Sequence, residues 1–207
     1  MNKIIYGIIL LCVISVSIST KAKMKATEHI DKLVLGAGCF WGVEKEYALI
    51  PGVIDVVSGY ADGTGVEPNY KAITQPENKN NPNNHAEVVE ITFNKNEIPV
   101  DDLIRHFFEN HDPTQLNRQG NDVGTQYRSV IFFHNDEQKE IAEESKIVAE
   151  RSEYWDGKIV TEITLLNKYH DAEDYHDNYY NENPNQPYCL FVIKPKLDKL
   201  EKQGLFD

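Results

Sequence analysis

Short apolar runs separated by polar, glycine-rich stretches are the main pattern along this chain, and they predict alternating strands and helices. Runs that are continuously apolar or alternate every second residue predict strands at 32–35, 53–60, 85–93, 130–133, 158–165 and 189–193. Helical spacing and capping residues predict helices at 43–49, at 101–110, after Asn135, and from Asp171 to Tyr180. This alternation indicates an α+β or α/β fold of two layers with a mixed sheet.

Two long segments lack any apolar period. The first runs from about Gly63 to Asn84, and the second covers residues 111–129. Loops of this length inside a compact domain are usually functional or mobile. The second segment is rich in aromatic, amide and charged side chains, so we interpret it as an ordered loop that builds a site.

The N-terminus has the pattern of a leader. Lys3 precedes an apolar run at residues 4–18, and a polar stretch follows at 19–23. The run is shorter than the ~20 residues that a membrane-spanning helix usually needs, which favours a secretory signal peptide over an anchor. We therefore expect residues 1–24 to be a signal peptide or N-terminal anchor, residues 25–207 to be one domain, and the protein to be exported, either periplasmic or extracellular.

Composition limits the class of protein. A chain of 207 residues with 41 % hydrophobic residues suits one domain with a core. The formal net charge of −12 makes a nucleic-acid partner a poor fit, because such partners need a basic surface. Solubility is the simpler explanation of this acidity.

Outside the leader the chain keeps two cysteines, Cys39 and Cys189. In an exported protein two distant cysteines suggest a structural disulfide, and the alternative is a catalytic thiol. Cys39 lies at a predicted strand-to-helix turn, followed at once by Phe40 and Trp41. A helix N-terminus favours negative charge, so we expect a lowered pKa for the Cys39 thiol, and this favours the catalytic alternative.

Glu87 is the most informative acid. It shares the apolar face of the predicted strand 85–93 with Val89. A carboxyl group on a buried face is costly unless it is paired or its pKa is raised, which indicates a functional role. The alternative, a solvated Glu at a frayed strand end, is equally compatible with the sequence.

Other candidate polar groups lie in the two irregular segments. Tyr70 and Tyr127 are away from any periodic apolar face, so their hydroxyl groups are available to a ligand, whereas a core tyrosine would be the ordinary case. Asp122 could orient a polar group, although a turn role is more common for such a residue. No histidine pair has the i, i+4 spacing of a helical zinc site, so we expect no metal, and we interpret His170 and His176 as surface or capping groups.

Together these segments resemble one family, the A-type peptide methionine sulfoxide reductases. The motifs that carry the resemblance are GCFWG at 38–42, GY at 59–60, HAEVV at 85–89, HDPTQ at 111–115, RQGNDVGTQYRS at 118–129, and EDYH at 173–176 with Tyr179. They occur in the family's order over roughly residues 32–200. The resemblance implies a ferredoxin-like core in a single catalytic domain, and reduction of methionine-(S)-sulfoxide, free or in proteins.

The resemblance also implies roles for individual residues. Cys39 would attack the sulfoxide sulfur and become a sulfenic acid, and Glu87 would give a proton to the sulfoxide oxygen. The oxygen would accept hydrogen bonds from Tyr70 and Tyr127. Asp122 would anchor the substrate backbone or a water, and two aromatic residues would hold the substrate methyl group, namely Phe40 and Trp41. No bound cofactor is implied, only an external thiol reductant such as thioredoxin, and the protein is expected to be a monomer.

Recycling of the enzyme is less well defined by the sequence. Many relatives carry a glycine-rich C-terminal tail with recycling cysteines, but here Cys189 is followed by an apolar stretch that predicts a strand. Cys189 is therefore a possible resolving cysteine or a buried bystander. Two other classes compete with the reductase: a non-catalytic exported protein that binds a methyl-bearing ligand, and a cysteine hydrolase, which would need a histidine beside Cys39.

Overall fold

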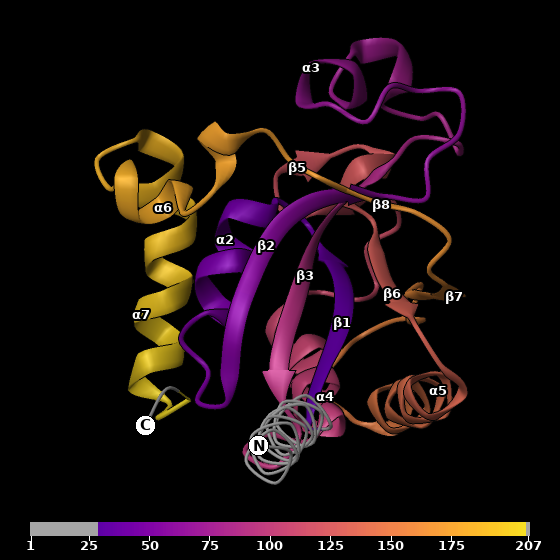
Figure 1. Ribbon diagram of the computed structural model, residues 1–207, viewed down its shortest axis with the longest axis vertical. Helices are drawn as coiled ribbons and strands as arrows, with labels where there is room; N and C mark the ends of the chain where they lie inside the picture. Colours follow the sequence, from indigo (N-terminus) through magenta and orange to yellow (C-terminus); the bar gives the residue numbers. More distant parts are fainter. Residues whose placement is uncertain (1–28, 206–207) are drawn as a thin grey trace, which may run out of the picture.

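A six-stranded sheet forms the frame of the molecule (Figure 1). The computed structural model describes residues 29–205. The order across the sheet is β7-β6-β1-β3-β2-β8, and all neighbours are antiparallel except the parallel pair β6 and β7. The mixed sheet and the α+β class are thus confirmed. The strands of this sheet are β1 (Ile30–Ala37), β2 (Val53–Ala61), β3 (Ala86–Asn94), β6 (Ser129–Phe133), β7 (Glu162–Leu165) and β8 (Tyr169–Asp171).

Four longer helices and several short elements complete the fold. The longer helices are α2 (Phe40–Tyr47), α4 (Val100–Asn110), α5 (Asp136–Arg151) and α7 (Lys194–Lys202). Asn135 caps α5 as predicted, since its side chain accepts a hydrogen bond from the Gln138 N–H. The short elements are α3 (Tyr70–Ile73), η1 (Pro76–Asn78), the hairpin β4 (Arg118–Gln119) and β5 (Asp122–Val123), η2 (Thr125–Tyr127), η3 (Asp174–His176), α6 (Tyr179–Glu182) and η4 (Cys189–Ile193).

Both faces of the sheet are buried, which explains the nearly continuous apolar runs of its central strands. On one face, alternate strand residues such as Leu33, Leu35 and Ile91 pack in the same cluster as helix residues such as Phe40 and Leu103. The other face has a smaller cluster of strand residues, namely Val34, Ala61, Ala86, Val88, Val130 and Phe132. The larger cluster fixes α2 and α4 on the sheet through burial of apolar surface.

The strand register brings segments that are distant in the sequence to one end of the sheet, where strands begin or end. Ala37 of β1 is opposite Ser129 of β6, and Tyr60 of β2 is opposite Glu87 of β3. The end of β1, the start of β3 and the start of β6 therefore meet at this end of the sheet, which is the upper one in Figure 1. Any side chain just beyond these strand ends is close to the others, although 47 residues separate Phe40 from Glu87.

The C-terminal region differs most from the sequence-based prediction. Residues 189–193 are not a strand but a turn of π-helix, η4, which continues directly into α7. Cys189, Ile193, Leu197 and Leu200 are buried. Their spacing of four, four and three residues is helical, so a run of five apolar residues was ambiguous by itself.

Three smaller differences concern the bounds of predicted elements and the structure of the irregular segments. The strand predicted at 158–165 begins only at Glu162. The predicted helix 171–180 is replaced by the end of edge strand β8, by η3 and by α6, with Asn178 in a left-handed conformation (φ 51°) between the last two. The two irregular segments contain α3 and the β4–β5 hairpin, short elements that carry no apolar period.

The predicted leader, residues 1–24, lies outside the described residues. Among residues 29–205 no helix has both the length and the apolar character needed to cross a membrane.

Candidate active site

Cys39 lies on the tight turn between β1 and α2, as predicted. It is the N-cap residue of α2, with extended backbone angles (φ −60°, ψ 123°). The preceding Gly38 has φ +95°, and a Cβ placed there would be 2.7 Å from the Gln119 Cβ. Glycine is needed at this position for both reasons. The turn thus holds the thiol at the end of the sheet where β1 ends and β3 and β6 begin.

The pKa of the Cys39 thiol is shifted in the direction opposite to the predicted one. Burial raises the pKa of the thiol well above its usual value, and the negative charge of Glu87 raises it further. A hydrogen bond from the Trp41 N–H at the start of α2 lowers the thiol pKa, but this effect is smaller than that of burial. The prediction of a lowered thiol pKa was wrong because the dipole of α2 is a smaller effect than desolvation. In this arrangement the thiol keeps its proton at neutral pH.

Glu87 is buried, so of the two alternatives the buried carboxyl group is correct and the frayed strand end is wrong. It is 1 % exposed, and its Oε2 accepts a hydrogen bond from the Phe40 N–H at 3.3 Å. Burial, together with the charge of Asp122, raises the pKa of Glu87 to about 8. Its Oε1 has no hydrogen-bond partner among the described residues. Glu87 is therefore a carboxylic acid at neutral pH, available to donate a proton.

Two phenol groups lie close to this acid. Burial and then the charge of Glu87 raise the pKa of Tyr70 and of Tyr127, and Cys39 contributes to both shifts. Both hydroxyl groups are therefore hydrogen-bond donors at neutral pH. Tyr70 is held at the start of α3 because its N–H donates to Glu173 Oε1 at 3.0 Å, and Glu173 also accepts a bond from the Tyr60 hydroxyl at 2.6 Å.

Three aromatic rings form a triangular apolar site next to Cys39. The ring centroids of Phe40, Trp41 and Tyr70 are separated by 6.5, 6.5 and 6.3 Å. Tyr179 stacks on the outer side of the Trp41 indole at 3.7 Å. The three rings thus form an apolar surface beside the thiol.

His176 was misinterpreted from the sequence as a surface or capping group. It is fully buried, and its Nδ1 accepts a hydrogen bond from the Trp41 Nε1–H at 2.9 Å. Its ring is also 4.9 Å from Phe40 and 4.7 Å from Tyr70, so it contacts all three members of the aromatic triangle. Burial lowers the pKa of His176, which keeps the imidazole neutral. The EDYH motif was the sequence signal that could have revealed it.

Tyr188 is a site residue that the sequence analysis did not identify. Its hydroxyl donates a hydrogen bond to Asp122 Oδ2 and also lies against the Cys39 thiol. Burial raises the pKa of Asp122, and the bond from Tyr188 partly offsets this effect. Asp122 is therefore held in the site and is not an ordinary turn residue. Tyr188 directly precedes Cys189, and no periodic pattern distinguishes it.

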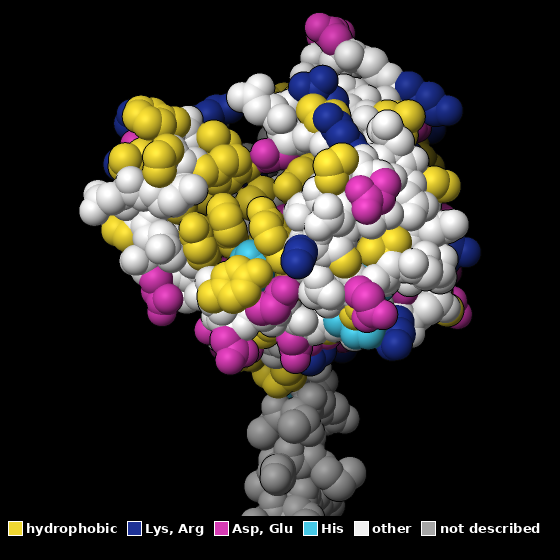
Figure 2. Space-filling model, turned by 90° about the horizontal axis from the view of Figure 1, so that it is seen from above, with side chains coloured by type: hydrophobic (Ala, Val, Ile, Leu, Met, Phe, Trp, Pro, Cys, Tyr) yellow, Lys and Arg dark blue, Asp and Glu magenta, His cyan; other side chains and the backbone are white. Residues whose placement is uncertain are grey.

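A groove opens beside Cys39, between α2, the β4–β5 turn and η4. We call it the Cys39 groove, and its volume is about 340 Å³. Figure 2 shows this end of the molecule, where hydrophobic side chains surround a hollow between the α6 side and the α3 side. The residues that line the groove are Ala37, Cys39, Gly42, Val43, Asn110, Gln119, Gly120, Asn121, Asp122, Tyr188, Phe191, Val192, Ile193 and Lys196.

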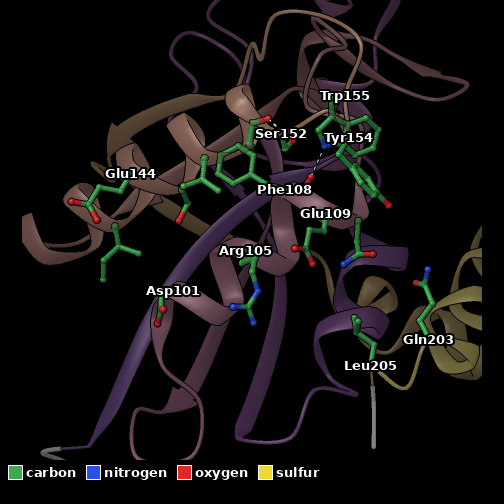
Figure 3. A pocket seen from close by; sticks show the side chains of 15 residues that line it. Asp101, Arg105, Phe108, Glu109, Glu144, Ser152, Tyr154, Trp155, Gln203 and Leu205 are labelled. Carbon is green, nitrogen blue, oxygen red and sulfur yellow. Dashed lines mark hydrogen bonds between the residues drawn. The ribbon is translucent and has the colours of Figure 1, made fainter.

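A larger hollow of about 820 Å³ lies elsewhere, along α4 and α5 (Figure 3). Its walls include Phe108 and Trp155, whose indole N–H donates to the Phe108 carbonyl at 2.8 Å, and its rim is polar. None of the candidate site residues lines it. We therefore place the chemistry at Cys39 in spite of the smaller volume there.

Cys189 and Cys39 are not joined in a disulfide, and each is a thiol. Cys189 is 0 % exposed and packs in a cluster with Ile193 and Leu197, next to Trp41 and Tyr188. Burial also raises the pKa of the Cys189 thiol. The alternative of a structural disulfide is thus not supported, and a second thiol packs next to Trp41 and Tyr188. Among residues 29–205 no group of three or more His, Cys, Asp and Glu is arranged to hold a metal ion.

The combination of these groups defines a class of protein. Attack on a carbonyl group by a cysteine hydrolase needs a base that removes the thiol proton, whereas the side chains that affect the pKa of Cys39 are Glu87, Asp122 and Tyr188, and a histidine is not among them. A thiol beside a protonated carboxyl group and two phenols suits removal of an oxygen atom from a substrate. The site is that of a thiol-dependent oxidoreductase.

Comparisons with known proteins agree with this class and define the family. The profile of the peptide methionine sulfoxide reductase family matches residues 31–206. The chain is 47 % identical over 173 residues to the peptide methionine sulfoxide reductase MsrA of Trichodesmium erythraeum. The matched segment covers 84 % of this chain and 95 % of that protein. The chain therefore belongs to the peptide methionine sulfoxide reductase family, and it is a thiol-dependent reductase of methionine sulfoxide.

Solved structures show the same fold. Mxr1 from Saccharomyces cerevisiae in reduced form matches with a TM-score of 0.69 and 32 % identity, over 79 % of this chain and 91 % of Mxr1. Mxr1 in complex with Trx2 matches with a TM-score of 0.51 and 25 % identity, over 73 % of this chain and 86 % of that chain.

Proposed function

We propose that Cys39 reduces methionine-(S)-sulfoxide while Glu87 acts as the proton donor. The observation that carries this proposal is the buried, protonated Glu87 carboxyl group beside the Cys39 turn, with a pKa of about 8 and an unpartnered Oε1. A sulfoxide is a poor electrophile until its oxygen is protonated, so the acid is needed at the moment of attack. Tyr70 and Tyr127 would donate hydrogen bonds to the same oxygen and stabilise the charge that develops there.

The atoms balance without a bound cofactor. The Cys39 sulfur attacks the sulfoxide sulfur, and Glu87 gives its proton to the sulfoxide oxygen. Attack forms a transient bond between the two sulfur atoms. The protonated oxygen then moves to the Cys39 sulfur: the Cys39 S–O bond forms, the substrate S–O bond and the transient S–S bond break, Cys39 becomes a sulfenic acid, and methionine leaves as a thioether. The proton lost by the Cys39 thiol replaces the one that Glu87 gave. Oxygen transfer thus oxidises Cys39 and reduces the substrate by two electrons.

The aromatic triangle accounts for a choice between the two sulfoxide epimers. With the oxygen directed to Glu87 and the methyl group between Phe40 and Trp41, only one configuration at sulfur leaves the main chain outside. The mirror-image substrate would put its oxygen among the rings, where it loses its hydrogen bonds. Asp122, held by Tyr188, would anchor the substrate main chain or a bound water.

We propose Cys189 as the resolving thiol. It would condense with the Cys39 sulfenic acid, which releases water and forms a disulfide, and an external dithiol would then reduce the disulfide by exchange. Because Cys189 is buried in a helical turn, η4 must open before the two sulfur atoms can meet. The complex of Mxr1 with Trx2 supports a thioredoxin as the external reductant. Export of the protein and a monomeric state remain predictions.

A direct assay tests this function. The protein is incubated with the two epimers of N-acetyl-methionine sulfoxide and dithiothreitol, and the sulfide product is measured. We expect conversion of the S epimer only, and loss of conversion in Cys39→Ser. Full retention of turnover in Cys39→Ser would contradict the role of this thiol. Binding of the sulfoxide by the unaltered protein without any conversion would instead favour the non-catalytic binding protein.

A further inference from the structure

The short helix that carries Tyr70 has little to hold it in place by itself. α3 is a single turn of four residues, and within the described residues of α3 and η1 Ile73 alone is buried. A helix this short is not stable in isolation. In Figure 1 α3 lies above the upper end of the sheet, apart from the longer helices. The position of the Tyr70 hydroxyl therefore depends on polar contacts from other segments.

Side chains from distant segments bind α3 at both of its ends. At the first residue, the Tyr70 N–H donates to Glu173 Oε1 at 3.0 Å. At the last residue, the Asn84 side-chain amide donates to the Ile73 carbonyl at 2.9 Å, and it also donates to the Asn78 carbonyl of η1 at 3.2 Å. Asn84 is 0 % exposed. A buried side chain at the end of the loop thus fixes both of the short helices in that loop.

Thr125 joins this loop to η2. Its N–H donates to the Lys79 carbonyl at 2.9 Å. Its hydroxyl group donates to the Asn78 carbonyl at 3.2 Å and to the Asn81 carbonyl at 2.9 Å. Thr125 is buried, so these bonds lie in a medium of low dielectric constant, where they are stronger than in water. The loop that contains α3 and the turn η2 are therefore bonded directly to each other.

Arg128 completes the same connection. Its Nη1 donates to the Asn84 carbonyl at 3.1 Å and to the Thr125 carbonyl at 2.9 Å, so one guanidinium nitrogen bridges the two segments. Its Nε–H donates to Glu162 Oε2 at 3.3 Å, and this contact pairs the buried charge. Arg128 lies between Tyr127 and the first residue of β6. We call the three residues Asn84, Thr125 and Arg128 the loop junction.

The two phenol groups depend on the loop junction to different degrees. Tyr127 lies just before β6, and the buried residues of this strand fix its place. Tyr70 lies within the loop between β2, which ends at Ala61, and β3, which begins at Ala86. Loss of the loop junction should therefore displace Tyr70 relative to Tyr127 and the Cys39 turn, while Tyr127 stays close to its position.

We propose that Asn84, Thr125 and Arg128 are positioning residues for the reaction. They hold the Tyr70 hydroxyl at the distance from the Tyr127 hydroxyl that a shared sulfoxide oxygen requires. The inference rests on the proposed function, and it adds residues that act without touching the substrate. A shift of about 1 Å in a group that stabilises developing charge lowers the rate strongly, even when the thiol and the acid are intact. The effect of the loop junction is thus transmitted through Tyr70.

The test uses Thr125→Val, which removes the hydroxyl bonds at nearly constant volume and keeps the main-chain bond to Lys79. With N-acetyl-methionine-(S)-sulfoxide as substrate and dithiothreitol as reductant, kcat/KM should fall about ten- to hundredfold. Thr125→Ser keeps a hydroxyl group and should retain most of kcat/KM. Thr92→Val is the matched control, because Thr92 is opposite Lys32 at the other end of the sheet, and kcat/KM should be unchanged.

A double-mutant cycle separates this role from a purely structural one. In Tyr70→Phe the displaced hydroxyl is already missing, so addition of Thr125→Val should lower kcat/KM by less than about twofold further. In Tyr127→Phe, addition of Thr125→Val should still cause most of its full loss. An equal loss in Tyr70→Phe and in the unaltered protein would overturn the inference, because the loop junction would then act on something other than Tyr70. An unchanged kcat/KM in Thr125→Val would overturn it too.

Arg128→Lys takes the place of Thr125→Val in the same cycle if that variant does not fold. Lysine keeps the charge but lacks the planar guanidinium that bridges the two carbonyl groups. The same comparison with Tyr70→Phe then decides the inference. Failure of the unaltered protein to reduce the sulfoxide would refute the proposed function itself, which is a different result. Full activity in Tyr70→Phe alone would overturn the inference, since the Tyr70 hydroxyl would then have no role to be positioned for.

Discussion

At the scale of single residues, the site depends on two groups that keep their protons. Burial raises the pKa of the Cys39 thiol and of the Glu87 carboxyl group, and each negative charge would make the other more costly. The pair therefore rests in its neutral form at pH 7. A substrate oxygen that accepts the Glu87 proton lets the thiol release its own. Under the proposed mechanism, the site therefore favours a substrate that can take up a proton.

The pH dependence of activity follows from Glu87. Its protonated form is the active one and its pKa is about 8, so kcat/KM should be constant below that pH and fall about tenfold per pH unit above it. Glu87→Gln should lower kcat/KM by roughly 10²- to 10⁴-fold and remove this alkaline fall. Glu44→Gln is the control, because Glu44 is also a buried acid with a raised pKa but bonds Ser58 and the Asn178 N–H. An alkaline fall near pH 8 that persists in Glu87→Gln would show that another group donates the proton.

His176 should act through Trp41 and not on the substrate. In His176→Phe the Trp41 indole N–H loses its acceptor while the ring volume is nearly kept, so the ring loses its fixed orientation. Loss of one hydrogen bond of this kind is worth about 1–3 kcal/mol, and we expect KM for the sulfoxide to rise roughly 5- to 150-fold. The alkaline fall near pH 8 should stay in place. His134→Phe, at an exposed position, should leave KM unchanged, and an unchanged KM in His176→Phe would refute the positioning role.

Sequence motifs gave the identity of most site residues, but not their electrostatics. Cys39, Glu87, Tyr70, Tyr127 and Asp122 were all predicted and lie within interaction range of one another. The direction of the Cys39 pKa shift was wrong because desolvation depends on packing by distant segments. Tyr188 was missed because no local pattern reveals its contacts. His176 lies in the EDYH motif, but its contact with Trp41 depends on packing between distant segments and was not predicted.

At the scale of elements, η4 and α7 join catalysis to recycling. The predicted strand at 189–193 was wrong, because apolar residues in a short continuous run fit either period until the next turns of helix are considered. In the structure Cys189, Ile193 and Leu197 form one buried face against the aromatic layer around Trp41. In the proposed recycling, the Cys189 thiol is withheld by this packing, and its release would require partial loss of this helix.

Loosening this face should speed up disulfide formation. Leu197→Ala removes buried side-chain volume from α7 and should destabilise its packing by about 2–5 kcal/mol. We expect the Cys39–Cys189 disulfide to form faster after one turnover, measured by quenched mass spectrometry, while release of methionine keeps its rate. Leu103→Ala in α4, a comparable core change away from η4, is the control. An unchanged rate in Leu197→Ala would contradict the gating role of this helix.

At the scale of the whole molecule, strand register is what assembles the site. β1 ends, and β3 and β6 begin, at the same end of the sheet. This register places Cys39, Glu87 and Tyr127 together. The alternation of apolar runs was sufficient to predict an α+β or α/β fold with a mixed sheet. It could not give the strand order, because register depends on pairings between residues far apart in the sequence.

The described fold also predicts that residues 1–24, the expected leader, are dispensable for catalysis. β1 begins at Ile30, and the family match begins at residue 31. A chain of residues 25–207 should therefore keep kcat/KM for N-acetyl-methionine-(S)-sulfoxide within about twofold and should keep its melting temperature within a few degrees. Activity assays and calorimetry of both forms provide the measurement. A large loss of activity in the shorter chain would show that the N-terminal residues belong to the catalytic domain.

The most direct measurement of the central claim is a single turnover without reductant in Cys189→Ser. The protein is mixed with an equimolar amount of N-acetyl-methionine-(S)-sulfoxide, trapped with a reagent for sulfenic acids, and examined by peptide mass spectrometry. Our account predicts one sulfide product per protein and one oxygen atom on Cys39. Formation of the sulfide with Cys39 unmodified would contradict the account.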